Sequence, residues 1–208
     1  MKDPPLVLPT RERILDTSKE LFARRGYHGS SIRDIAGALN VSVSAVYNHF
    51  RSKDAILLEV LRRPIVDQTI AIEGVLASSP GGDALDRLAL CLRVHYAYLL
   101  GHKLDAELIN SEYLRLTDEA RASIVKLRNA YEAIFRRLVV GCLPAGQREP
   151  EPPAVTVAVN ILLGLAGNNH RWFREDGPMS SNQVLDFYVR FAIGGLRAAL
   201  NEGRQHTG

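Results

Sequence analysis

Apolar residues recur every three or four positions along most of the chain, which is the period of an amphipathic α-helix. In the first third of the sequence this spacing predicts four helices, over about residues 10–25, 31–40, 42–50 and 52–63. Neither the strict alternation of a half-buried strand nor a two-residue hairpin turn is found. We therefore expect an all-α fold.

Individual residues mark the ends of these first helices. Ser31 is followed three positions later by Asp34, the spacing of a capping box, and Ser42 is expected to cap the third helix. Gly26 is expected to end the first helix, since glycine commonly follows a last helical turn. Pro64 lacks a backbone N–H group, so it is expected to interrupt or kink the helix that precedes it.

The rest of the chain shows a second series of helical segments, separated by glycine, proline or helix-capping residues. Asp83 and Thr117 are expected to cap the helices that follow them, and Ser180 with Gln183 forms a second capping box. Residues 144–153 carry four prolines and are expected to form a loop. The expected helices cover about residues 66–78, 84–102, 105–115, 118–142, 154–174 and 181–202.

Composition argues against several classes of protein. The longest apolar stretch, residues 154–167, is shorter than the roughly 20 residues of a membrane-spanning helix. Cys91 and Cys142 lie in apolar helical patterns, so we expect buried thiols in the reducing cytoplasm. The histidines lack other ligands at metal-binding spacing, and no nucleophile motif or Gly-rich phosphate loop occurs. We expect no metal, no cofactor, no membrane partner and no catalysis.

Charge is unevenly distributed between the two series of helices. Residues 1–53 carry nine Lys or Arg and five Asp or Glu, whereas the remaining 155 residues carry 17 and 18. The basic excess therefore lies at the N-terminal end, where a polyanionic partner is expected to bind.

The second and third predicted helices have the spacing of a helix-turn-helix, in which the second helix enters the major groove of DNA. That role requires a small or polar outward face with apolar residues behind it. Val46 and Phe50 are expected to face the core. The residues expected to face outward are Val43, Ser44, Tyr47 and Asn48. Ser31, His49 and Lys53 supply further donors for phosphate oxygens.

These residues together resemble the N-terminal signature of the TetR family of transcriptional regulators. The similarity runs without a gap through Gly26-Tyr27, Ser31-Ile32-Arg33-Asp34-Ile35-Ala36, Val41-Ser42, Val46-Tyr47-Asn48-His49-Phe50 and Ser52-Lys53. The resemblance implies that Tyr47, His49 and Lys53 meet DNA phosphates. It also implies that Arg33, Val43, Ser44 and Asn48 lie nearest the bases. Ser31 replaces the threonine that is usual in the family and keeps its hydroxyl.

This resemblance predicts a flexible arm over residues 1–9, a helix-turn-helix DNA-binding domain over 10–54, and a ligand-binding and dimerisation domain over 55–208. Other interpretations of single residues stay open. Tyr47 is also explained as a core aromatic, His49 as a partly buried structural histidine, and Arg33 as a solvated charge.

The two last predicted helices, over residues 154–174 and 181–202, are expected to form a homodimer interface. The final helix carries one stripe, which comprises Val184, Tyr188, Phe191, Ala192, Gly195, Leu196 and Ala199. Identical patches of this kind suit a two-fold four-helix interface, which is how TetR-like regulators dimerise. The alternative is that the stripe only completes the core of a monomer.

A small-molecule site is expected in the C-terminal domain. Asn168, Arg171 and Trp172 follow an apolar stretch, and such polar groups suggest a ligand if they face inward. Arg171 suits a carboxylate or phosphate, and Trp172 suits a ring. His95, Tyr96 and Tyr131 are candidates for the wall of a pocket. The alternative is that the segment around residue 171 emerges into solvent and that the aromatics are packing residues.

Residues 168–196 are loosely similar to the C-terminal domains of acyl-CoA-responsive TetR regulators. This implies a coenzyme A thioester as the effector, and a hydrophobic or aromatic acid is the rival. The expected function is a repressor that binds palindromic operator DNA as a homodimer and releases it when the effector binds. The alternatives are a DNA-binding activator or architectural protein without an effector, and an acyl-thioester enzyme.

Overall fold

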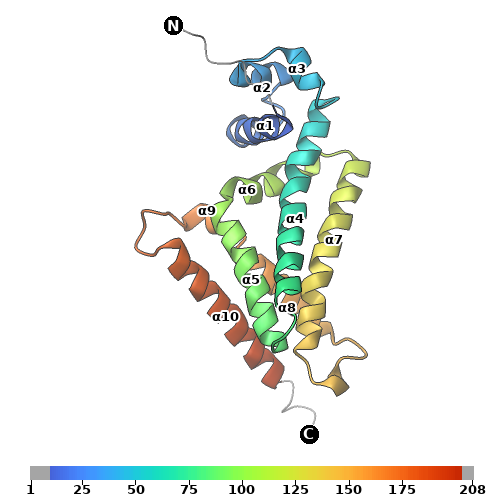
Figure 1. Cartoon of the computed structure of the whole chain (residues 1–208), viewed down its shortest axis with the longest axis vertical. Coiled ribbons are helices and arrows are strands. Elements are labelled where there is room, and N and C mark those ends of the chain that lie inside the picture. Colours follow the sequence, from blue (N-terminus) through green and yellow to red (C-terminus); the bar gives the residue numbers. More distant parts are fainter. Residues whose placement is uncertain (1–9, 203–208) are drawn as a thin grey trace. The chain divides into compact units, whose positions relative to one another are not determined.

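The computed structural model describes residues 10–202, and the arm predicted over residues 1–9 lies outside them (Figure 1). Within the described range the chain forms helices and turns and no strand, so the expected all-α fold is confirmed. The helices are α1 (Arg11–Arg25), α2 (Ile32–Leu39), α3 (Val43–Tyr47), α4 (Lys53–Ser78), α5 (Ala84–Gly101), α6 (Lys103–Glu112), α7 (Asp118–Gly141), α8 (Pro153–Gly164), α9 (Asn169–Trp172) and α10 (Ser181–Glu202), with 3-10 turns at Tyr113–Arg115 and Ala145–Gln147.

The described residues pack as two compact units. The first unit contains those up to Pro64 together with Glu107–Val125. The second contains Ile65–Ala106 and those from Lys126 onward. The units are defined by packing within the chain, and the domain boundary proposed at residue 54 stays a prediction.

The first unit is built on α1, α2 and α3, with α2 packed against both of the others. The helix ends follow the predicted chemistry. The capping box of Ser31 and Asp34 is formed, and the Ser42 hydroxyl accepts from the backbone N–H of Ala45. Gly26 ends α1 with φ of 73°, a conformation that favours glycine. The buried side chains of these three helices are Ile14, Leu15, Ser18, Phe22, Ile35, Ala36 and Val46.

The second unit has one apolar core. Helix α10 lies along α5, and α9 contacts the same helix (Figure 1). Leu92, Tyr96 and Phe135 are among the side chains buried at its centre. Cys91 is buried in it and Cys142 is partly buried, both as free thiols. Burial raises the pKa of each thiol to about 11, so both are neutral at physiological pH.

Three expectations about helix boundaries are wrong. Pro64 does not interrupt α4, which continues to Ser78, because proline keeps a helical φ and removes only one backbone donor. The helix expected over 154–174 is broken between α8 and α9, where Gly164 and Gly167 favour a turn closed by the 3.0 Å bond from Gly167 N to Gly164 O. Asp83 precedes α5 but makes no side-chain cap.

Residues 10–202 contain neither a membrane-spanning helix nor a metal centre. None of the helices there combines the length and the apolar character that crossing a membrane requires. No three His, Cys, Asp or Glu side chains of that range are grouped so that they could hold a metal ion.

Candidate functional site

Helix α3 presents a polar surface on a buried apolar base. Val46 is fully buried, whereas Tyr47 is 51% exposed. Ser44, Asn48 and His49 are also exposed, and Val43 is half-buried. The Ser44 hydroxyl lies 2.8 Å from that of Ser42. The alternative that Tyr47 is a core aromatic does not hold, and the arrangement leaves a row of hydrogen-bonding groups open to a partner.

Helix α2 contributes two predicted contact residues with different surroundings. The Ser31 hydroxyl accepts from the backbone N–H of Asp34 at 3.2 Å, so its first role is to cap the helix. Hydrogen bonds from Ser31 lower the pKa of the Asp34 carboxyl, which therefore stays charged near the helix N-terminus. The Arg33 side chain is exposed. Ser31 and Arg33 are both accessible to a partner, and the longer side chain of Arg33 extends farther from α2.

Lys53 occupies a different setting from the exposed residues of α3. Its Nζ atom donates to the carbonyl oxygens of Tyr27 and Ser30, each at 2.8 Å. It also lies 4.1 Å from the centroid of the Tyr27 ring. The ammonium group therefore binds the loop between α1 and α2 in this structure.

Tyr27 joins that loop to two other segments of the first unit. Its hydroxyl donates to Asp54 Oδ1 at 2.5 Å, and its backbone N–H donates to Glu112 Oε1 at 3.4 Å. Burial, followed by the Asp54 carboxylate, raises the pKa of the tyrosine, so the phenol stays protonated. These contacts were missed at the sequence level because Tyr27 and Glu112 are far apart along the chain.

The second unit contains a buried polar cluster that includes His95, Tyr96 and Tyr131, the predicted pocket-wall residues. The Tyr131 hydroxyl lies 2.9 Å from Nδ1 of His95, and the Gln68 amide oxygen lies 3.1 Å from the same nitrogen. His95 Nε2 lies 3.1 Å from the carbonyl oxygen of Leu163. Burial lowers the pKa of His95 to about 4 from 6.5, so the ring is neutral at physiological pH.

The end of α8 depends on this cluster. The Tyr96 hydroxyl donates to the carbonyl oxygen of Leu162 at 2.8 Å, and His95 contacts the next carbonyl. The last carbonyls of a helix lack intrahelical partners, so these side chains satisfy groups that would otherwise be buried without one. Just beyond, Asn169 accepts from the Tyr188 hydroxyl at 2.6 Å, and its buried Nδ2 atom has no partner within residues 10–202.

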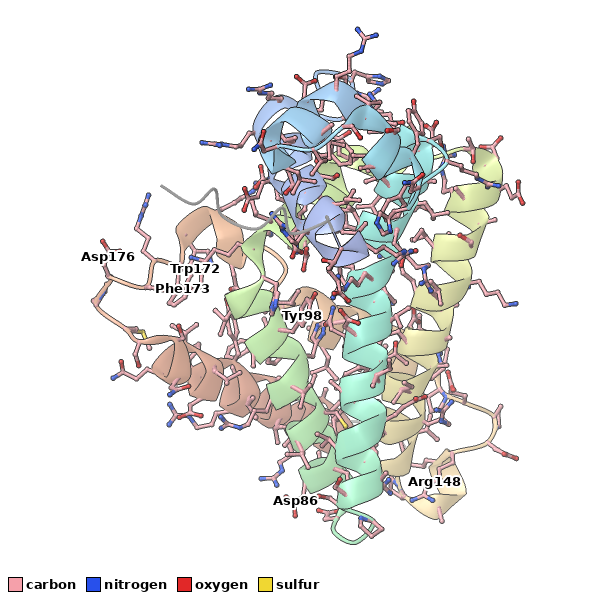
Figure 2. The ribbon with its side chains drawn as sticks, turned by 45° about the horizontal axis from the view of Figure 1, so that its top comes forward. Asp86, Tyr98, Arg148, Trp172, Phe173 and Asp176 are labelled. Atoms are coloured by element: carbon pink, nitrogen blue, oxygen red, sulfur yellow. The ribbon has the colours of Figure 1, made fainter. Side chains whose placement is uncertain are left out.

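The predicted ligand residues around α9 lie at the surface. Trp172 is 55% exposed, and Asn168 and Arg171 are exposed too. Trp172 lies beside the buried Phe173, close to the segment that leads to Asp176 (Figure 2). This agrees with the alternative that the segment emerges into solvent. The Trp172 ring contacts Tyr188, which in turn contacts the predicted wall residue Tyr96.

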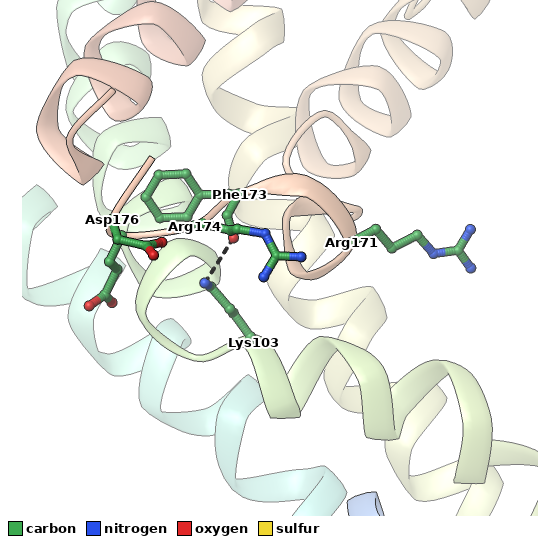
Figure 3. A pocket seen from close by; sticks show the side chains of 6 residues that line it. Lys103, Arg171, Phe173, Arg174 and Asp176 are labelled. Carbon is green, nitrogen blue, oxygen red and sulfur yellow. Dashed lines mark hydrogen bonds between the residues drawn. The ribbon is translucent and has the colours of Figure 1, made fainter. Parts of the chain in front are cut away.

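A pocket of about 380 Å³ lies next to α9. Lys103 Nζ donates to the Phe173 carbonyl at 3.0 Å and lies 4.9 Å from the Phe173 ring centroid (Figure 3). Arg171 extends away from Lys103 in this view (Figure 3). The pocket is lined by Lys103, Arg171, Phe173, Arg174, Glu175 and Asp176. Sequence reasoning missed Lys103, since a lone lysine at a helix start carries no signal of a partner 70 positions away.

Helices α8 and α10 each carry exposed apolar side chains. The apolar stripe that was predicted on the last helix is therefore partly buried and partly exposed. Val184, Ala192 and Leu196 are buried in the core, whereas Phe191 is 59% exposed. Phe187 stacks on Phe191 with a centroid separation of 6.1 Å. On α8 the exposed apolar residues are Val157 and Ile161. One helix therefore serves both the monomer core and an outer apolar surface.

Known proteins resemble this chain along most of its length. A model described as bacterial regulatory proteins of the tetR family matches residues 14–60, and one described as a tetracyclin repressor-like C-terminal domain matches residues 81–196. The chain is 26% identical over 200 residues to the HTH-type transcriptional repressor KstR2 of Mycobacterium tuberculosis, with 89% of this chain and 92% of that protein covered.

Two solved structures share the fold. The TetR family regulator PfmR from Thermus thermophilus matches with a TM-score of 0.73 and 28% identity, over 87% of this chain and 97% of that one. AibR, solved with isovaleryl coenzyme A and operator DNA, matches with a TM-score of 0.71 and 24% identity, over 87% and 96%. Because the C-terminal model alone matches more than half of the sequence and the N-terminal model matches at the helix-turn-helix, the chain belongs to the TetR family of bacterial transcriptional regulators.

Proposed function

We propose that this regulator is a repressor that binds palindromic operator DNA as a homodimer and releases it when a small effector binds. The observation that carries the proposal is the exposed polar face of α3 above the buried Val46. The second helix of a helix-turn-helix enters the major groove and needs polar residues toward base edges and phosphates, and this division of α3 supplies them.

The proposed DNA contacts fall into two groups, those to phosphates and those to bases. The Tyr47 hydroxyl and the His49 ring are proposed to donate to phosphates, which fixes the position of α3 in the groove. Arg33, Val43, Ser44 and Asn48 are proposed to lie nearest the bases, and Ser31 to meet the backbone at the start of α2. The Val43 side chain suits a thymine methyl group, and Asn48 suits adenine.

Dimerisation is proposed through α8 and α10. The exposed Val157, Ile161, Phe187 and Phe191 side chains are apolar and would leave water in a two-fold interface. A dimer places two copies of α3 on successive major grooves, so its operator is expected to be an inverted repeat.

The effector is proposed to be a coenzyme A thioester. The alternative effector is an aromatic or hydrophobic acid. Arg171 would bind a phosphate or carboxylate, and Trp172 would stack on the adenine ring. The exposed Asn168 and the unpartnered Nδ2 of Asn169 supply further polar contacts. The solved structure of AibR, which is in complex with isovaleryl coenzyme A, supports this choice of class.

His95, Tyr96 and Tyr131 are proposed as the inner wall against which the acyl group binds. In this structure the Gln68 amide lies beside His95 and Tyr131, and His95 and Tyr96 donate hydrogen bonds to the end of α8. A ligand that replaces some of these contacts would favour a second arrangement of α4, which carries Gln68 and begins at Lys53. This is the proposed route by which effector binding weakens DNA binding.

The proposal is tested by anisotropy of a fluorescent duplex that the protein has selected from random-sequence DNA. We expect tight binding that falls steeply with salt concentration, because phosphate neutralisation releases counterions. Acyl-CoAs of increasing chain length, the matching free acids and aromatic acids are then added. An effective ligand displaces the duplex and, at about 100 times its Kd, raises the Tm by about 5–10 °C.

Each alternative function gives a different result. An activator or architectural protein without an effector keeps its duplex in every ligand, with no rise in Tm. An acyl-thioester enzyme would release free coenzyme A, which a thiol reagent detects. Absence of salt-sensitive DNA binding would refute the regulator. The free thiols of Cys91, which is buried, and of Cys142, which is partly buried, fit the proposed location in the reducing cytoplasm.

A further inference from the structure

Asn169 is a buried asparagine whose side-chain amide has a partner at one end only. The residue is 1% exposed. Its oxygen, Oδ1, accepts from the Tyr188 hydroxyl at 2.6 Å. Its nitrogen, Nδ2, is buried and has no hydrogen-bond partner among the residues that the structure describes. Because a buried donor without a partner is costly, a ligand that accepts a hydrogen bond there would be bound with a clear advantage.

The bond with Tyr188 shows which end of the amide is open. A separation of 2.6 Å is typical of an O–H···O bond and shorter than a usual N–H···O bond. Burial raises the pKa of Tyr188, so the phenol keeps its proton and its O–H group donates. Oδ1 therefore faces the tyrosine. The open end of Asn169 is the nitrogen, which carries two N–H donors and no acceptor, so a ligand atom that pairs with it must be an acceptor.

The backbone around Asn169 holds this amide in place. Its N–H group donates to the carbonyl oxygen of Ala166 at 3.3 Å, and its own carbonyl oxygen accepts from the N–H group of Phe173 at 2.9 Å. Ala166 and Phe173 are both buried in the core of the second unit. Because the backbone and Oδ1 are both bound, Nδ2 has a defined position.

Aromatic rings connect Asn169 to the surface on one side and to the proposed acyl wall on the other. The Tyr188 ring lies 6.5 Å from the ring of Trp172, which is 55% exposed, and 5.5 Å from the ring of the buried Tyr96. An acyl group that enters beside Trp172 and ends against Tyr96 would therefore bring its carbonyl group close to Asn169.

We propose that Nδ2 of Asn169 donates a hydrogen bond to the carbonyl oxygen of the effector's thioester group and so selects acyl thioesters over ligands without that oxygen. The inference rests on the proposed coenzyme A effector and assigns the atom that recognises the acyl group. A neutral carbonyl group fits this position better than a carboxylate, because Asn169 and Tyr188 are uncharged and a buried carboxylate requires a charged partner.

The first test uses the wild-type protein and pairs of ligands that differ only at the carbonyl group. Butyryl-, hexanoyl-, octanoyl- and benzoyl-CoA are compared with butyl-, hexyl-, octyl- and benzyl-CoA, which are thioethers with a methylene group in place of the carbonyl. Calorimetric titration gives each Kd. We expect each thioester that binds to have a Kd about tenfold lower than its thioether, since the thioether leaves Nδ2 unpaired. Equal affinity within the pairs would overturn the proposal.

The second test removes the donor together with its partner. Asn169→Leu/Tyr188→Phe replaces both hydrogen-bonded side chains by apolar groups of similar shape. We expect the thioester affinity of this variant to fall about tenfold, to that of the thioether, and its thioether affinity to stay unchanged. Its Tm without ligand should equal or exceed that of wild type, since the variant has no unpaired Nδ2. Asn129→Leu, which replaces an exposed asparagine of α7, is the control and should keep the wild-type ratio of affinities.

The outcomes separate this contact from the function of the whole chain. A double variant with a lower Tm and the wild-type preference for thioesters would show that Asn169 is only structural, and the proposal would fail. If no thioester binds the wild-type protein, the proposed effector class fails and the contact fails with it, whereas DNA binding, measured without ligand, still tests the operator contacts. A wild-type protein that discriminates within the pairs but binds no duplex would refute the repressor and keep the contact.

Discussion

The Nε2 atom of His95 lies 3.1 Å from the carbonyl oxygen of Leu163, so this nitrogen carries the proton of the neutral ring. The carbonyl accepts, and Nδ1 is left to accept from the Tyr131 hydroxyl. A side chain of α5 thereby satisfies the last turn of α8, which Gly164 and Gly167 end early. The buried cluster of the second unit thus satisfies carbonyl oxygens that the break in the helix leaves without intrahelical partners.

Stability is expected to fall in mild acid because of His95. Its folded pKa of about 4 is below the unfolded value of 6.5, so the unfolded chain binds the proton first. The contribution of the neutral ring to the free energy of unfolding is therefore complete above pH 6.5. It decreases by about 3 kcal/mol as the pH falls toward 4. Urea unfolding at a series of pH values measures this free energy.

The variant that checks this prediction is His95→Gln. It should flatten the pH dependence of the free energy of unfolding between pH 6.5 and about 4. Equal pH dependence in wild type and His95→Gln would show that the buried ring is not its source.

Tyr47→Phe is expected to weaken DNA binding without affecting stability. The substitution removes only the hydroxyl of a half-exposed ring, so one phosphate hydrogen bond is lost per subunit and the dimer binds about tenfold less tightly. Anisotropy with the selected duplex and thermal melting are the measurements. Tyr98→Phe, whose hydroxyl binds Asp105, is the control and should bind DNA normally. Unchanged affinity in Tyr47→Phe would remove Tyr47 from the interface.

Phe191→Asp is expected to give a monomer with weak DNA binding. The charge would be buried in the proposed two-fold interface, next to Phe187, without a partner. Sedimentation velocity gives the mass in solution. Ile70→Asp is the control, because Ile70 is also an exposed apolar residue, 63% accessible, and lies on α4. A dimeric Phe191→Asp protein would place the interface elsewhere.

Arg171→Ala and Trp172→Leu are expected to abolish the rise in Tm caused by an acyl-CoA and to keep operator affinity. Both side chains are exposed, so neither substitution should unfold the protein. Differential scanning fluorimetry with and without the ligand checks this. Arg115→Ala removes an exposed arginine of the first unit and should respond like wild type. If the acyl-CoA still raised the Tm of both variants, the α9 segment would be excluded as the effector site.

Local chemistry made much of the fold predictable. The Ser31–Asp34 and Ser180–Gln183 capping boxes, the Thr117 cap and the glycine end of α1 all depend on residues within one turn of each other. The helix pattern also indicated the outward face of α3. Pro64 was predicted wrongly because a proline with a helical φ costs α4 only one backbone donor. The 154–174 segment was predicted wrongly because its local pattern does not show the contacts of His95 and Tyr96 with the end of α8.

The candidate site was less predictable where distant segments meet. The contacts of Lys53 with Tyr27, of Tyr27 with Glu112, and of Lys103 with Phe173 join residues 26 to 85 positions apart. No short-range pattern encodes such pairs. The sequence also could not predict that α10 has one buried and one exposed apolar face. It shows which residues are apolar, but not which neighbouring element covers them.

The central claim, that α3 of a two-fold dimer enters the grooves of a duplex, is tested most directly by selecting bound sites from random DNA. We expect an inverted repeat with half-sites one helical turn apart, and no enrichment by a Tyr47→Phe/His49→Ala variant that melts like wild type. Failure of the wild-type protein to enrich any sequence, or equal enrichment by that variant, would contradict the account.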